Sequence, residues 1–296
     1  MTNRRSTPPR NDGRLSRSLL ASLLLLPLLL LTACVTGADM RQDRQQLANS
    51  IAAKADMSPF RLDAGRFTFQ GYTRIKAADS GNAALYIEGD GQAWRTYTQP
   101  SPNPTPTDPV GLRLAAQDTS MANVIYLARP CQYTRQWNQP GCPTRFWTSH
   151  RFAPVVIKSY MAALDRLKTR HDIDRFHLSG YSGGGAVATL LAARRDDVAT
   201  LRTIAGNLDH ARLNAYHNVT PMPDSVNPAD KAGRLGDVAQ IHYSGAADEI
   251  VPPMIAKSFI AKLALGTCAR HRIIEGATHH NWRKFWPELA ADMPAC

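Results

Sequence analysis

A Gly-x-Ser-x-Gly turn lies within the stretch His177-Leu178-Ser179-Gly180-Tyr181-Ser182-Gly183-Gly184-Gly185-Ala186. A short apolar strand precedes this turn, and a helix-forming segment, 186–194, follows it at once. A serine in such a turn has a strained backbone, so its neighbours must lack side chains, as Gly180 and Gly184 do. The helix that follows directs free backbone N–H groups toward negative charge at the serine. The stretch therefore predicts that Ser182 is a nucleophile.

Segments with strand and helix patterns alternate on both sides of this turn. The alternation predicts a mainly parallel sheet with helices on both faces. Residues 67–70 and 71–75 are expected to form a pair of strands, and the proline-dense segment 99–107 is expected to be a surface loop. The other expected strands are 84–88, 124–129, 175–179, 201–205, 239–244 and 270–274. The expected helices are 41–54, 110–118, 155–171, 186–194, 253–263 and one at the C-terminus.

An aspartate and a histidine follow the serine in the chain. Asp248 lies in a loop after the expected strand 239–244, within Gly-Ala-Ala-Asp-Glu-Ile-Val-Pro, and His279 lies in Gly-Ala-Thr-His-His after the strand 270–274. The turn, the acid loop and the Gly-x-x-His motif, in this order, resemble the α/β-hydrolase superfamily over most of residues 60–296. Within it, the Ile-Glu-Gly-Asp-Gly and Arg-Pro-Cys-Gln-Tyr segments resemble uncharacterised bacterial envelope hydrolases. The resemblance implies an α/β-hydrolase fold with a short cap over residues 208–232.

The resemblance also implies roles for individual side chains. Ser182 would be the nucleophile, His279 the base, and Asp248 the acid that orients the histidine. His280 remains an alternative base. Asp209 is a rival acid, although substrate contact or helix capping suits it better. A metal site built on the two histidines lacks a third ligand at a suitable spacing, so neither a metal nor another cofactor is expected.

An oxyanion hole needs two backbone N–H groups. The resemblance implies Gly183 as one donor and Asp90 or Gly91, in a glycine-rich turn, as the other; an ordinary β-turn is the alternative. A carboxylate close to the oxyanion would repel it, so the Asp90 side chain is expected to point away. Aromatic residues in the flanking loops are expected to pack in the core more often than to line a pocket. They are Trp94, Tyr97, Trp137, Phe146, Trp147 and Trp282.

The N-terminus has the pattern of a targeting signal: a basic leader precedes an apolar run from Leu19 to Leu31. Leu-Thr-Ala-Cys at 31–34 resembles the lipobox of bacterial lipoproteins. It implies a signal peptide, 1–33, and a lipidated Cys34; plain secretion with cleavage near residue 33 is the alternative. We expect a tether and helix over 34–58 and a catalytic domain over 59–296. Val35 favours the periplasmic face of the outer membrane.

The chain has five cysteines, four of them after Cys34. An even remainder in an oxidising compartment predicts two disulfides, and four free thiols are the alternative. Proximity in the sequence favours the pairs Cys131–Cys142 and Cys268–Cys296.

The net charge is +11, and the five arginines and one aspartate of the leader leave about +7 for the remaining residues. The excess is scattered, and no nucleic-acid motif is present. The sequence predicts an exported serine hydrolase, anchored to the membrane by lipid, that cleaves an ester or thioester in a small-molecule or envelope-derived acyl substrate. The alternatives are an amidase or peptidase with the same triad, and a non-catalytic envelope protein on the same fold. The oligomeric state is left open.

Overall fold

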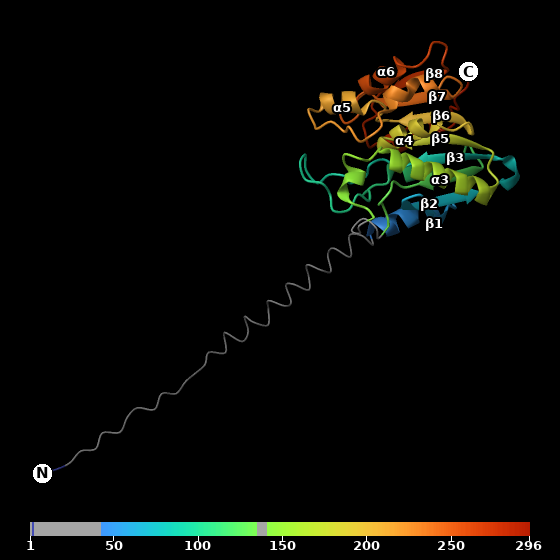
Figure 1. The fold of residues 1–296 in the computed structure, drawn as a ribbon. Coiled ribbons are helices and arrows are strands. Elements are labelled where there is room, and N and C mark those ends of the chain that lie inside the picture. Colours follow the sequence, from blue (N-terminus) through green and yellow to red (C-terminus); the bar gives the residue numbers. More distant parts are fainter. Residues whose placement is uncertain (1, 3–42, 135–140) are drawn as a thin grey trace. The chain divides into compact units, whose positions relative to one another are not determined.

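The computed structural model describes residue 2 and residues 43–134 and 141–296 (Figure 1). The predicted signal peptide, the lipidated Cys34 and Trp137 lie outside these residues and stay predictions. Within the described ranges, no helix combines the length and the apolar character needed to cross a membrane.

An eight-stranded sheet with the order β1-β2-β4-β3-β5-β6-β7-β8 forms the centre of the domain (Figure 1). β2 is antiparallel to both of its neighbours, and the strands from β4 to β8 are parallel to one another. The predicted, mainly parallel sheet is therefore confirmed. The strands are β1 Ser58–Ala64, β2 Phe67–Ile75, β3 Asn82–Ile87, β4 Asn123–Leu127, β5 Arg175–Tyr181, β6 Val198–Ile204, β7 Ala239–Gly245 and β8 Ala269–Ile274.

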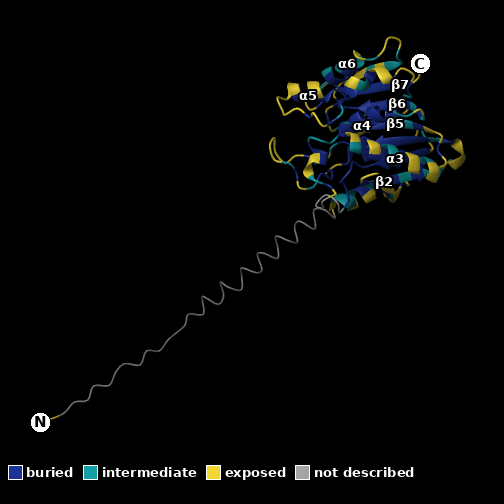
Figure 2. Cartoon of the chain, viewed as in Figure 1, coloured by how far each residue is buried: buried dark blue, intermediate teal, exposed yellow. Residues whose placement is uncertain are grey.

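Helices cover both faces of the sheet, and each face has its own apolar cluster. Alternate residues of β3 enter the two clusters: Leu85 and Ile87 face α3 and α4, whereas Ala84 and Tyr86 face α2 and α7. The central strands, from β3 to β7 along the chain, are mostly buried, whereas the edge strands β1 and β8 are not (Figure 2). The helices are α2 Val110–Gln117, α3 Pro154–His171, α4 Gly183–Ala192, α5 His210–Tyr216, α6 Met254–Ile260 and α7 Trp286–Leu289. The short 3-10 helices are η1 Ala78–Ser80, η3 Thr144–Trp147, η4 Pro228–Arg234 and η5 Trp282–Lys284.

One local expectation is wrong. Residues 67–75 form the single strand β2, and its partner is β1. Gly71 lies within this strand. The ring of Phe60 packs over it, in the space that a side chain at position 71 would occupy. The proline-dense segment is a loop, as expected, and it is partly buried. Trp147 Nε1 donates to the carbonyl of Ser101, and Gln92 N–H donates to that of Pro104.

The segment 43–53 is helical, and the compact unit of the domain begins at Arg44. Ala48 and Ala52 are buried in the cluster on the α2 face, and Gln45 Nε2 donates to the Tyr72 hydroxyl at 2.9 Å. The helix therefore packs on the sheet as part of the domain.

Of the aromatic residues expected in the core, Phe146, Trp147 and Trp282 are buried, but Trp94 and Tyr97 are exposed. The residues after β6 form a short cap from α5 and η4. Disulfides join Cys131 to Cys142 and Cys268 to Cys296.

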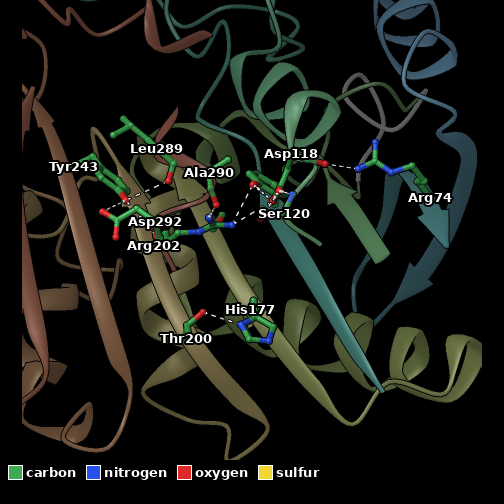
Figure 3. A network of polar contacts seen from close by, with 12 residues as sticks. Arg74, Asp118, Ser120, His177, Thr200, Arg202, Tyr243, Leu289, Ala290 and Asp292 are labelled. Carbon is green, nitrogen blue, oxygen red and sulfur yellow. Dashed lines mark hydrogen bonds and ion pairs between the residues drawn. The ribbon is translucent and has the colours of Figure 1, made fainter. Parts of the chain in front are cut away.

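A charged network is buried between the sheet and the C-terminal segment (Figure 3). Arg202 Nη2 lies 3.3 Å from Asp118 Oδ2, and both side chains are fully buried. Arg202 Nη1 also donates to the carbonyl of Ala290 at 2.7 Å, and a guanidinium of Arg74 donates to the carbonyl of Asp118. The network ties β6 to α2 and to the residues after α7.

Candidate active site

The candidate site residues lie where parallel strands end. Ser182 follows β5, Asp90 follows β3, Asp248 follows β7, and His279 follows β8. The carboxyl ends of parallel strands meet at one edge of a sheet, which is where α/β proteins bind ligands. Residues up to 189 positions apart in the chain therefore meet at this edge.

Ser182 has φ 51° and ψ −119°, a strained conformation for a residue other than glycine. Its N–H donates to the carbonyl of Ile204 at 2.9 Å, and its carbonyl accepts from Asn207 N–H at 3.0 Å. A Cβ atom on Gly180 would overlap the carbonyl of Gly184. The sharp strand-to-helix turn thus depends on the glycines that the sequence places there.

The structure brings the three predicted triad residues into contact. His279 Nε2 lies 3.1 Å from Ser182 Oγ, and His279 Nδ1 lies 2.9 Å from Asp248 Oδ2. Asp248 and His279 are buried. This order of contacts suits removal of a proton from the serine by the histidine, with the carboxylate fixing the ring.

Further contacts hold the acid and the base in place. Asp248 Oδ1 accepts hydrogen bonds from the N–H groups of Ile250 and Val251 at 2.9 and 2.8 Å. The Tyr181 hydroxyl donates to the carbonyl of His279 at 2.9 Å. Burial raises the pKa of this tyrosine well above its ordinary value, so its hydroxyl keeps the donated proton.

The alternative residues lie elsewhere. His280 is exposed, and its ring stands perpendicular to that of His279 with the centroids 5.2 Å apart. Burial and the neighbouring His279 lower the pKa of His280. Asp209 caps α5 by accepting from Arg212 N–H, and it also accepts from the hydroxyl of Ser258. Helix capping, one of the two roles favoured for Asp209, is therefore observed.

The turn after β3 packs against the serine turn. A Cβ atom on Gly89 would lie 2.9 Å from the Tyr181 ring and 3.3 Å from Ser182 Cβ. Gly91 faces the other way, because a Cβ atom there would overlap the carbonyl of Pro104. Asp90 contacts Gly183, one residue from the nucleophile.

The Asp90 carboxylate lies against Gly183, so its negative charge is not kept at a distance from this predicted donor. A Cβ atom on Gly183 would overlap Asp90 Oδ1. Ion pairs compensate the negative charge instead, since Nη1 of Arg129 lies 2.8 Å from Asp90 Oδ1 and Nη1 of Arg151 lies 3.2 Å from Oδ2. Neither arginine was predicted from the sequence as an individual site residue.

Glu88 is a second buried carboxylate that the sequence analysis did not assign. Its oxygens accept from the N–H groups of Gly89 and Gly111 at 2.9 Å, of Leu112 at 3.2 Å, and from the Tyr126 hydroxyl at 3.0 Å. Burial raises the pKa of Glu88, and these hydrogen bonds oppose the rise. Glu88 thus joins the glycine turn to the start of α2. Its place directly before Gly89 was the only signal in the sequence.

A hollow of about 470 Å³ lies beside His280. Arg113 forms an ion pair with Asp108 at its wall, whereas Arg283 and Lys284 have no acidic partner among the described residues. Its lining comprises Asp108, Val110, Arg113, His280, Asn281, Arg283 and Lys284. In the part of the chain that the structure describes, no group of three or more His, Cys, Asp or Glu side chains is placed to hold a metal ion.

No model of a protein family matches the chain, and no curated protein matches it. Solved structures do. Est1E from Butyrivibrio proteoclasticus is similar with a TM-score of 0.56 and 12% identity, over 79% of this chain and 96% of that one. A bacterial membrane phospholipase A is similar with a TM-score of 0.57 and 14% identity, over 94% of this chain and 96% of that one. The acylaminoacyl peptidase of Pyrococcus horikoshii is similar with a TM-score of 0.56 and 11% identity, over 78% of this chain and 39% of that one.

These structures share the sheet and its helices at low sequence identity. Together with the strand order and the strained serine turn, they establish the class: the chain has the α/β-hydrolase fold.

Proposed function

We propose that this protein is a serine hydrolase that cleaves an ester or thioester through an acyl-enzyme. The observation that carries the proposal is the position of His279, whose two ring nitrogens lie within hydrogen-bond distance of Ser182 Oγ and Asp248 Oδ2. Similar structures named as an esterase, from Pyrococcus furiosus, and as a phospholipase support an ester substrate.

In the first half of the reaction, Ser182 Oγ bonds to the carbonyl carbon and its proton passes to His279 Nε2. The carbonyl π electrons move onto the oxygen, and the N–H groups of Gly183 and Asp90 stabilise the resulting charge. The double bond then re-forms, the bond to the alcohol or thiol breaks, and His279 protonates the leaving group. Water repeats these steps on the acyl-enzyme and releases the acid.

Asp90 is the better second donor than Gly91. Asp90 contacts Gly183, whereas Gly91 faces Pro104. No hydrogen-bond acceptor for Asp90 N–H occurs among the described residues, so this donor is free to meet the substrate.

An amidase or peptidase with the same triad is the second candidate, because an acylaminoacyl peptidase also shares the fold. A fluorophosphonate probe and a panel of 4-nitrophenyl esters, thioesters and anilides test both. We expect the probe to label wild type and not Ser182→Ala, and we expect ester turnover to exceed anilide turnover. Labelling with anilides preferred would favour the peptidase. If neither labelling nor turnover occurs, a non-catalytic envelope protein becomes the better description.

We also propose export and a lipid anchor at Cys34, which rest on the leader and the lipobox. Labelled palmitate should enter wild type and not Cys34→Ala, and the labelled protein should fractionate with the outer membrane. Release of a shorter, unlabelled protein into the periplasm would instead indicate plain secretion.

The hollow beside His280 is the proposed place for part of the substrate, because His280, which lines it, directly follows the proposed base His279 in the chain. Arg283 and Lys284 would favour a negatively charged group there. Changing both to Gln should raise KM for an ester that carries a carboxylate and leave KM for a neutral ester unchanged. Equal effects on both esters would exclude this role for the hollow.

A further inference from the structure

The two peptide units on either side of Gly89 are each fixed by one side chain. Glu88 Oε1 accepts from the N–H of Gly89, and Gln132 Nε2 donates to its carbonyl at 3.1 Å. None of the described peptide bonds is cis, so the carbonyl of Gly89 and the N–H of Asp90, which share one peptide, point in opposite directions. Gln132 therefore determines where the Asp90 N–H points.

Gln132 is itself held by the backbone that carries Arg129. Its Oε1 accepts from Arg129 N–H at 3.0 Å, and the side chain is buried. The same arginine reaches the Asp90 carboxylate through Nη1 at 2.8 Å. One short segment thus fixes both the main chain and the side chain at Asp90.

Two arginines share the single Asp90 carboxylate. The exposed fractions of the Arg129 and Arg151 side chains are 5% and 14%, and neither has another acidic partner within the described ranges. Their guanidinium carbons lie 5.3 and 5.4 Å from the centroid of the Phe152 ring, a contact that offsets part of their desolvation. Two guanidinium charges paired with one carboxylate leave a surplus of one positive charge at Asp90, next to Gly183. Since buried charge without a partner is destabilising, this surplus calls for an explanation.

We propose that Gln132, Arg129 and Arg151 are positioning residues for the oxyanion hole. Gln132 aims the N–H of Asp90 at the oxyanion, and the two arginines hold the Asp90 side chain and supply positive charge that the oxyanion then balances. This inference rests on the proposed function, in which Ser182 is acylated.

The test uses variants of the full chain with a 4-nitrophenyl ester and with a boronic acid, which binds Ser182 as a tetrahedral anion. Gln132→Met removes both hydrogen bonds, and Gln132→Glu keeps only the acceptor for Arg129 N–H. Both should lower kcat by about 10- to 100-fold with KM little changed, and weaken boronic acid binding by a similar factor. The matched control is Gln240→Met. It removes a buried glutamine that donates to the carbonyl of Leu235 near the start of β7, whereas Asp248 follows the end of this strand.

The role of the two arginines is tested by substitutions that remove or keep their positive charge. Arg129→Met and Arg151→Met should lower kcat, and Arg129→Lys should recover part of the loss. Arg145→Met is the control, because Arg145 also stacks on an aromatic ring, 5.1 Å from the Phe146 centroid, and is exposed. An active wild type whose variants lose thermal stability but keep kcat and boronic acid affinity would overturn this inference alone. A wild type that neither turns over esters nor reacts with a fluorophosphonate would remove the proposed function and this inference together.

Discussion

The carboxylate of Asp90 lies against the Cα atom of Gly183, in the space that a side chain on Gly183 would occupy. Because Arg129 and Arg151 hold the carboxylate, it cannot move aside without breaking an ion pair. The turn after β3 and the start of α4 are therefore fitted to each other at this point.

Gly183→Ala should consequently impair catalysis more than folding. The new methyl group displaces Asp90 and separates the two proposed oxyanion donors, so kcat should fall by about 100-fold or more. Steady-state kinetics on a 4-nitrophenyl ester and a thermal melt measure the two effects. Gly233→Ala is the control, since nothing lies within 4 Å of a Cβ atom there. Unchanged kcat in Gly183→Ala would contradict the fit described above.

The two adjacent histidines should differ sharply. His279→Gln removes the contact with both Ser182 and Asp248, and should lower kcat by at least about 10³-fold. His280→Gln should stay within about tenfold of wild type, because the hydrogen bonds to Ser182 and Asp248 come from the His279 ring. Parallel kinetics and fluorophosphonate labelling rates make the comparison. A larger loss in His280→Gln than in His279→Gln would assign the base to His280.

The sequence alone was sufficient to predict the features that depend on local backbone constraints and on the order of motifs along the chain. The serine turn requires small residues at fixed positions, and the acid and histidine follow the ends of later strands, so their order along the chain identified Ser182, Asp248 and His279 as a set. The alternation of strands and helices was sufficient for the mainly parallel sheet.

Other features depend on contacts that no local pattern encodes. Arg129 and Arg151 reach Asp90 from 39 and 61 residues away, and an arginine in a loop usually indicates solvent exposure. Gly71 was interpreted as a break between strands, because the Phe60 ring that packs over it belongs to β1, which was not predicted. Both features, the ion pairs of Asp90 and the continuous strand at Gly71, depend on packing between residues that are distant in the chain.

The buried pair Arg202–Asp118 should contribute to stability as a unit (Figure 3). Asp118→Asn leaves the Arg202 charge buried without its partner and should cost about 3–5 kcal/mol of unfolding free energy. Adding Arg202→Met should cost less than the sum of the single changes, with a coupling of about 1 kcal/mol or more. Urea unfolding of the four proteins measures this cycle.

The control for that cycle is the half-exposed pair Arg270–Asp292, where Arg270→Met should cost less than about 1 kcal/mol. Additive effects of Asp118→Asn and Arg202→Met would show that the two charges act independently.

Acid should destabilise the fold through His242. Burial lowers the pKa of this ring from 6.5 to about 3, so the unfolded chain binds the proton more tightly than the folded chain does. The stability that the neutral ring contributes is present above pH 6.5 and is lost as the pH falls toward about 3, at roughly 1.4 kcal/mol per pH unit. His242→Gln should therefore lose about 2 kcal/mol less than wild type between pH 7 and pH 5, as measured by urea unfolding. The exposed His217→Gln should behave as wild type does. Equal losses in wild type and His242→Gln would assign the acid sensitivity to other groups.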